Sequence, residues 1–236
     1  MKKKKKGEDK INIIYGNTEL NLMDYSEAKK LDKRNNLEIY FSLVKTNHPL
    51  ISSFLPNNDY NSFTIQICLF FFSFCLYFIL NSLFFTDETM HQIYEDEGIF
   101  NFIYNLPNII YSTLIYSIIN FIMKKLALTE ESILSLKNEK NSEEQKKKGK
   151  NIKNYLKIKF VSFFAISFNL LGIFWFYIGC FCAVFSNTQI YLLKDTMISF
   201  ALSLFLSFIK ILLKCLLRIH SLKEPGKFLY KLSKIL

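Results

Sequence analysis

Four long apolar runs constrain this chain more than any other feature of its sequence. They extend from Phe63 to Phe85, from Ile99 to Met123, from Phe160 to Phe185 and from Met197 to about Leu217. Each is long enough for a helix to cross roughly 30 Å of hydrocarbon at about 1.5 Å per residue. The sequence therefore predicts an all-α integral membrane protein with four transmembrane helices, and the lipid bilayer is its first expected partner.

Charge alternates between the segments that flank these runs. Residues 1–61 carry eleven Lys or Arg and eight Asp or Glu, and residues 124–159 carry eleven bases and five acids. Residues 86–98 hold five acids and no base, whereas the chain from residue 210 onward holds seven bases and one acid. Short loops rich in Lys and Arg stay on the cytosolic side of a membrane. With four spans, this rule predicts cytosolic termini, in a plasma membrane or an endomembrane.

The pattern divides the chain into three parts. These are a cytosolic segment of residues 1–61, a four-span domain of residues 62–217 and a basic cytosolic tail of residues 218–236. The spans cover about residues 63–85, 99–123, 160–185 and 197–217, and a basic cytosolic loop of residues 124–159 joins the second to the third. Within that loop Thr129, Glu130 and Glu131 resemble a helix start, and residues 138–154 are expected to be a flexible linker.

An amphipathic cytosolic helix is expected before the first span, over about residues 24–46. Asp24 or Ser26 can cap its start, and Asn47-His48-Pro49 would end it. Four apolar residues follow at i, i+3, i+4 and i+7 and would share one face of this helix, namely Leu37, Tyr40, Phe41 and Val44. Residues 1–20 are rich in Lys and Asn, a composition typical of disorder.

Polar and small residues inside the spans give weaker expectations. Pro107 either begins the second helix or kinks a longer one. Gly172 and Gly179 are seven residues apart and share a face that another helix could approach closely. Lys210, Lys214 and Arg218 form one stripe whose long side chains can reach the cytosolic headgroups. Asp195 is expected in a short outer loop, which leaves no acidic residue inside a span.

The acidic loop offers the one candidate site. Asp87, His91 and Glu95 follow at i, i+4 and i+8, so a helix would place them on one face, where they could contact a cation. The competing interpretation is that an acidic outer loop only complements basic inner loops. Residues 95–98 lack the alternating oxygen ligands of a calcium loop.

No sequence motif indicates catalysis. The chain has no Walker or GxGxxG loop, no CxxC pair and three His residues that are far apart in sequence. The five Cys lie inside or at the edge of apolar runs, as small buried hydrophobic residues do. The sequence therefore predicts no enzyme, no catalytic residue, no cofactor and no metal site.

Lysine clusters suggest lipid rather than nucleic acid as a partner. Lys2–Lys6 and Lys146–Lys148 could contact anionic headgroups. Nucleic-acid binding is not expected, because it does not explain why the bases avoid alternate loops.

Several phrases of the sequence carry a resemblance to a known family. They are Asn58-Asp59-Tyr60-Asn61-Ser62 before the first span, Thr89 to Gly98 after it, Leu106-Pro107 with Ile109-Ile110-Tyr111-Ser112 in the second, and Phe181-Cys182-Ala183-Val184 with Asn187-Thr188-Gln189 after the third. With them the chain resembles a family of uncharacterised transmembrane proteins of ciliated protozoa, over about residues 20–220. The resemblance implies a multi-span module and no biochemical activity.

These observations leave three classes of function open. The leading expectation is a non-enzymatic membrane module that associates with itself or with other membrane proteins. The alternative is a channel or transporter subunit with the acidic loop at its outer mouth, and a weaker alternative is a membrane-embedded enzyme.

Overall fold

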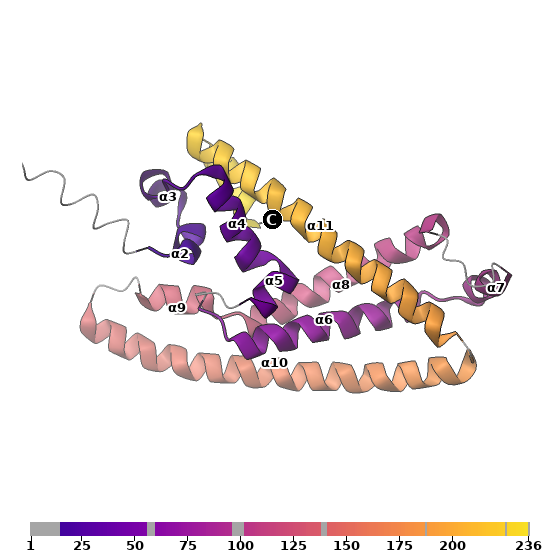
Figure 1. The fold of residues 1–236 in the computed structure, drawn as a ribbon. Coiled ribbons are helices and arrows are strands. Elements are labelled where there is room, and N and C mark those ends of the chain that lie inside the picture. The colour runs from indigo at the N-terminus through magenta and orange to yellow at the C-terminus, as the bar shows by residue number, and fades with distance from the viewer. Residues whose placement is uncertain are drawn as a thin grey trace, which may run out of the picture. The chain divides into compact units, whose positions relative to one another are not determined.

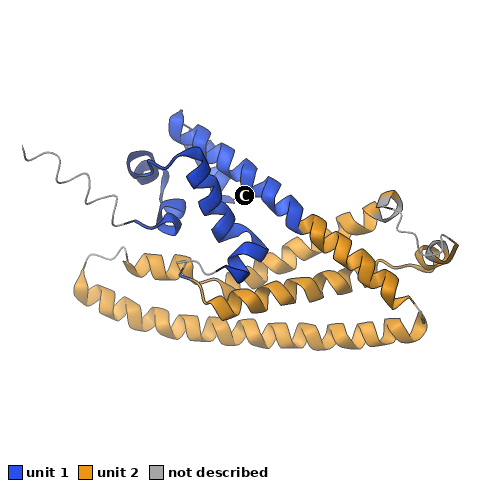
Figure 2. Cartoon of the chain, viewed as in Figure 1, with its two compact units in different colours: residues 1–60, 204–236 blue, residues 61–203 orange. Residues whose placement is uncertain are grey.

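The protein is all-α, as the sequence predicts, in a computed structural model that describes residues 15–55, 60–95, 102–137, 141–186, 188–224 and 226–235. Four of its helices are long and apolar enough to cross a membrane, so the chain is a multi-pass membrane protein. The described chain divides into two compact units, residues 1–60 with 204–236 (unit 1) and residues 61–203 (unit 2) (Figure 2).

Unit 1 combines short helices from both ends of the chain. In chain order they are α2 (Asn17–Leu22), α3 (Tyr25–Leu31), α4 (Asn36–Asn47), α5 (Pro49–Phe54), the last part of α11 (Gln189–Lys223) and α12 (Lys227–Ile235). Two apolar clusters hold them together. In one, Leu43 of α4 packs with Ile211 of α11, and in the other Ala28 of α3 packs with Tyr230 of α12.

The single amphipathic helix expected at residues 24–46 is two helices. Asp24 occupies the N-cap position of α3, as expected, but α3 ends at Leu31. A new cap starts α4, because the Asn35 side chain accepts a hydrogen bond from the Glu38 amide while Glu38 bonds back to the Asn35 amide. The chain turns away at His48, where α5 begins with Pro49.

The apolar face expected for that helix is only partly correct. Val44 is buried, but Leu37 and Phe41 are exposed, and Ile39 and Leu43 form the buried side instead. The expected disorder of residues 1–20 is wrong for its end, since α2 begins at Asn17; residues 1–14 lie outside the described chain.

Unit 2 is built around α6. Its helices are α6 (Phe63–Leu83), α7 (Asp87–Glu95), α8 (Phe102–Ala127), α9 (Glu130–Lys137), α10 (Ser142–Val184) and the first part of α11. Half of the most apolar 18-residue stretch of α6 is buried inside the protein, against 11% of the corresponding stretch of α10. Helix α6 is therefore the central helix, and α10 turns most of its apolar surface outward. Figure 1 shows α10 running beside α6.

Helix α10 is far longer than a single span. Its 43 residues extend about 65 Å, roughly twice the hydrocarbon thickness. The structure corrects the expected flexible linker over residues 142–154, because α10 starts at Ser142, while residues 138–140 lie outside the described chain. Helix α9, which begins at Glu130 as expected, packs against this Lys-rich half, with Gln145 of α10 donating to the Leu136 carbonyl.

Helix α11 starts earlier than its apolar run. The carbonyl of Thr188 accepts the amides of Tyr191 and Leu192, so the helix begins at Gln189, eight residues before Met197. Asp195 therefore lies on a helix and not in the outer loop where the sequence analysis placed it. Pro107 lies inside α8, so the second span is the longer helix and does not begin at Pro107.

Candidate functional site

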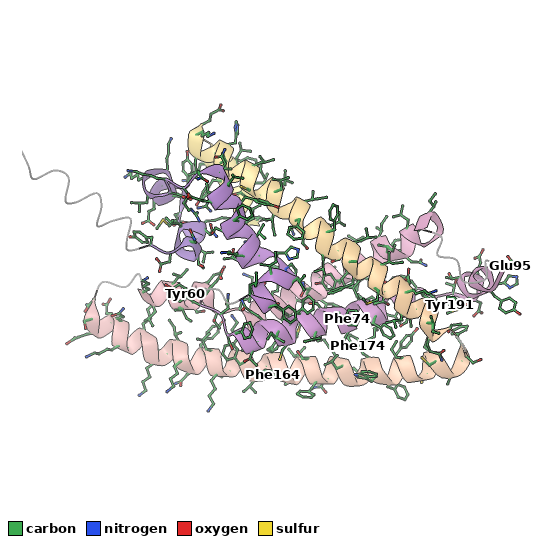
Figure 3. All side chains as sticks on the ribbon, in the orientation of Figure 1. Tyr60, Phe74, Glu95, Phe164, Phe174 and Tyr191 are labelled. Atoms are coloured by element: carbon green, nitrogen blue, oxygen red, sulfur yellow. The ribbon has the colours of Figure 1, made fainter. Side chains whose placement is uncertain are left out.

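The predicted cation contacts lie on one short exposed helix. Asp87, His91 and Glu95 all belong to α7, and His91 Nε2 is 3.2 Å from Glu95 Oε1. The side chains of His91 and Glu95 are 73% and 63% exposed, and Glu95 projects outward at the end of α7 (Figure 3). Within the described residues, no three His, Cys, Asp or Glu side chains come together in a way that could hold a metal ion.

A more enclosed site lies among the long helices of unit 2. Six polar side chains there are each no more than 4% exposed, and we call them the polar layer: Asn81 and Ser82 of α6, Ser112 of α8, and Asp195, Thr196 and Ser199 of α11. A carboxylate and amides are costly to bury among apolar helices unless they are paired.

Contacts place the α6 and α11 members of the layer together. Asn81 Nδ2 donates to Thr196 Oγ1 at 3.5 Å. One turn further along α11, the ring of Phe200 packs against Tyr77, with centroids 5.6 Å apart. Asp195 and Ser199 are four residues apart on α11, and together with Thr196 they lie on its buried side.

The register between α6 and α8 places Ser112 at the same level. Ser73 Oγ lies 3.3 Å from Asn120 Oδ1, and four residues further along α6 the tilted ring of Tyr77 packs against Tyr116 with centroids 4.2 Å apart. Each step of four along α6 is thus matched by a step of four backward along α8. The next step brings Asn81 opposite Ser112.

Helix α10 closes this level from another side. The hydroxyl of Tyr177 donates to the Ser82 carbonyl at 3.3 Å. One turn further on, Phe181 packs with Phe85 and Leu192 in a small apolar cluster. All four long helices therefore meet around the polar layer.

Four side-chain oxygens of the layer lack a hydrogen-bond partner among the described residues. They are Asn81 Oδ1, Ser112 Oγ, Asp195 Oδ1 and Ser199 Oγ. Two turns along α6 the polar groups are paired, because Ser73 donates to the Leu69 carbonyl at 2.8 Å and Asn120 Nδ2 of α8 donates to the Tyr116 hydroxyl at 2.9 Å. One turn along α6, the Tyr77 hydroxyl likewise lacks a hydrogen-bond partner among the described residues. Four of the unmet hydrogen bonds therefore lie in the layer that holds the buried carboxylate.

Unit 1 contains a buried ionic cluster of a different kind. The chain has two arginines, Arg34 and Arg218, and both bind Asp32. Arg34 makes a two-pronged contact with both carboxylate oxygens at 2.8 Å, and Arg218 Nη2 is 3.1 Å from Oδ2. The Asp32 side chain is 0% exposed and that of Arg218 is 2% exposed. The expectation that Arg218 extends to the headgroups is therefore wrong.

Neutral groups complete this cluster. Arg218 donates to the carbonyls of Asn21 and Leu20, and its guanidinium lies 5.2 Å from the centre of the Tyr230 ring. Burial acts to raise the pKa of Asp32, but the hydrogen bond and charge of Arg34 and the charge of Arg218 outweigh it and hold that pKa below its ordinary value. The cluster joins the N-terminal helices to the end of α11.

His48 is another buried titratable group of unit 1. Its ring stacks on Phe208 at 3.9 Å, its Nε2 lies 3.1 Å from the Leu204 carbonyl, and its Nδ1 accepts the Ile51 amide at 3.4 Å. These contacts need a neutral ring protonated on Nε2. Burial lowers the pKa of His48, although the bond to Leu204 acts in the opposite direction.

The predicted glycine face of α10 contacts no other helix within the described chain. No side chain or other helix comes within 4 Å of a Cβ built on Gly172 or on Gly179. The same side of α10 exposes four further residues at heptad spacing, namely Ala165, Asn169, Phe176 and Ala183. Asn169 turns its amide back to the Ala165 carbonyl at 2.8 Å.

Comparison with known proteins adds no assignment. The chain matches no family model, no curated protein and no solved structure. The resemblance to the ciliate family therefore remains a prediction. The sequence analysis missed the polar layer because it placed Asp195 in a loop. It missed the ionic cluster although one signal was present, namely two arginines among 30 basic residues.

Proposed function

We propose that this protein is a non-enzymatic membrane module that associates laterally with other membrane helices, either of a second copy or of another protein. The observation that carries the proposal is the open glycine face of α10, where no other helix of the described chain lies within 4 Å of a Cβ built on Gly172 or Gly179. Membrane helices associate through small residues that let two backbones approach closely.

The exposure of α10 and α11 supports the same conclusion. Only 11% of the apolar stretch of α10 and 17% of that of α11 is buried inside the chain. Most of this apolar surface therefore contacts lipid or another helix. Trp175 is 69% exposed near the middle of the apolar part of α10, away from the headgroup level where tryptophan usually lies.

The two ends of the chain support the proposed orientation with both termini in the cytosol. Residues from both ends fold together in unit 1, where Asp32 binds Arg218 and Tyr230 donates to the Met23 carbonyl at 2.8 Å. Segments that pack together lie on one side of the membrane, which requires an even number of spans. The Lys-rich half of α10 and the basic tail favour the cytosolic side.

Cross-linking in membranes tests the proposal. Copies carrying two different tags are expressed together, cross-linked and purified through one tag, and the co-purified proteins are identified by mass spectrometry. We expect Gly172→Leu with Gly179→Leu to lower recovery of the partner about tenfold or more, because the larger side chains hold the backbones apart. Cys180→Leu is the matched control, since Cys180 is exposed on a different face of the same helix turn. Recovery that is the same in all three proteins contradicts the proposal.

A channel or transporter subunit is the second candidate. The sequence predicts no acidic residue inside a span, which disfavours the transport of cations or protons. Asp195 on α11, 4% exposed, removes that argument. Flux through liposomes containing the purified protein, lost in Asp195→Asn and retained in Asp87→Asn, would favour this function over the module.

A further inference from the structure

We propose that the polar layer of unit 2 binds one exchangeable monovalent cation, Na⁺ or a proton, on the carboxylate of Asp195. This inference goes beyond the proposed membrane module and does not depend on it. It rests on the burial, the composition and the unmet hydrogen bonds of the layer.

Burial makes an unpaired carboxylate at this position costly. Asp195 is 4% exposed, and within the described chain it forms no ion pair. The adjacent Lys194 does not compensate it, because the Lys194 side chain is exposed and lies over the Tyr191 ring, 5.7 Å from its centre. A carboxylate among apolar helices needs a positive charge or a proton.

The groups that surround Asp195 supply oxygen and no positive charge. The titratable side chains that contact this level from α6, α8 and α10 are three tyrosines, Tyr77, Tyr116 and Tyr177, and none of them carries a positive charge. Helix α7 packs close by through Met90, but its acids Asp87 and Glu88 are exposed. The neutral members of the layer are one amide and four hydroxyls, whose oxygens are ligands for hard cations.

Charge balance selects a monovalent ion. One carboxylate neutralises a single positive charge, whereas Ca²⁺ and Mg²⁺ sites usually combine carboxylates with several further oxygens. The unpartnered oxygens of Asn81, Ser112, Asp195 and Ser199 all have lone pairs to offer a cation. A bound cation would displace no hydrogen bond from them, because none of the four has a partner among the described residues. A bound Na⁺, or a proton shared with Asn81, would satisfy oxygens that are otherwise unpaired.

The sodium form is tested by the thermal stability of the purified full-length protein in nanodiscs. Trp175, the single tryptophan of the chain, lies in unit 2 and reports its unfolding. At fixed pH and ionic strength, we expect replacement of choline chloride by NaCl to raise the unfolding midpoint by about 3 °C or more. We expect no such rise in Asp195→Asn, and an unchanged rise in the control Asp87→Asn.

Ser199→Ala separates a binding site from a merely structural role. If Ser199 Oγ is a ligand, its removal should raise the half-saturating Na⁺ concentration about tenfold. If that hydroxyl is simply buried and unpaired, its removal should leave the Na⁺ response unchanged and stabilise the protein in both salts. An unchanged Na⁺ response in Ser199→Ala would show that Ser199 Oγ is not a ligand of the cation.

The proton form is tested by infrared difference spectroscopy between pH 5 and pH 9. We expect a protonated carboxyl band that appears at the acidic end in the wild type and in Asp87→Asn but not in Asp195→Asn. Either the Na⁺ response or this band supports the proposal and identifies the ion. A wild type that shows neither, with Asp195 in one protonation state throughout, overturns it.

Discussion

At the scale of single residues, Asp32 is the most consequential side chain of unit 1. Asn in its place would leave the guanidinium charges of Arg34 and Arg218 buried without a counter-charge. Removing one partner of a buried ion pair costs about 3–5 kcal/mol. We therefore predict that Asp32→Asn opens unit 1. The readout is the alkylation rate of Cys215, the buried thiol of the same unit, in a variant whose other four cysteines are Ser.

Asp24→Asn is the control for that change, because Asp24 pairs with Lys234 at 3.1 Å while its side chain is 87% exposed. Exposed pairs contribute about 0–1 kcal/mol, so Cys215 should react at nearly the wild-type rate. Since the pKa of Asp32 is lowered on folding, its contribution is present above the ordinary value of 3.8 and is lost as the pH falls through the folded value. Equal alkylation of both variants would show that the cluster does not stabilise unit 1.

His48 predicts a second, milder pH dependence. Its pKa is lowered on folding, so its contribution is complete above about pH 6.5 and declines as the pH falls below that value. A protonated ring would also lose the bond that Nδ1 accepts from Ile51, a loss of about 1–3 kcal/mol. Amide hydrogen exchange of residues 39–51, corrected for intrinsic rates, should therefore accelerate between pH 7 and pH 5.5.

The variant His48→Gln should remove this pH dependence, because glutamine keeps a donor without titrating. His220→Gln should retain it, because His220 lies in an exposed pair with Glu224, its side chain 56% exposed. Acceleration that persists in His48→Gln would assign the effect to another group.

At the scale of helices, hydropathy identifies the apolar middle of each span and misses the ends. The four apolar runs are enough to predict four helices, but α10 and α11 begin where Asn141 and Thr188 start them. Those positions have no hydropathy signal, since a cap is a local hydrogen-bonding choice. The consequence is large for α11, because the eight residues that precede Met197 bring Asp195 onto a helix.

The Lys-rich start of α10 was misjudged for a related reason. Its composition is typical of disorder, but Glu143 and Glu144 precede Lys147 and Lys148 by four residues, which favours a helix. Packing of α9 against this half then adds contacts that composition does not reveal. For the same reason, partners distant in sequence, such as Asp32 and Arg218, were out of reach of any local pattern.

At the scale of the whole molecule, the proposed orientation makes a prediction about sidedness. In a cysteine-free background, single cysteines replace Glu88 on α7, Lys147 on α10 and His220 near the end of α11, all exposed. A maleimide that does not cross membranes is applied to intact cells. Because Lys-rich segments stay in the cytosol and one membrane-crossing helix separates Glu88 from Lys147, Glu88→Cys should react at once and the other two only after permeabilisation. Reaction of Lys147→Cys in intact cells together with Glu88→Cys would place α7 and the Lys-rich half of α10 in one compartment, which four membrane-crossing helices do not allow.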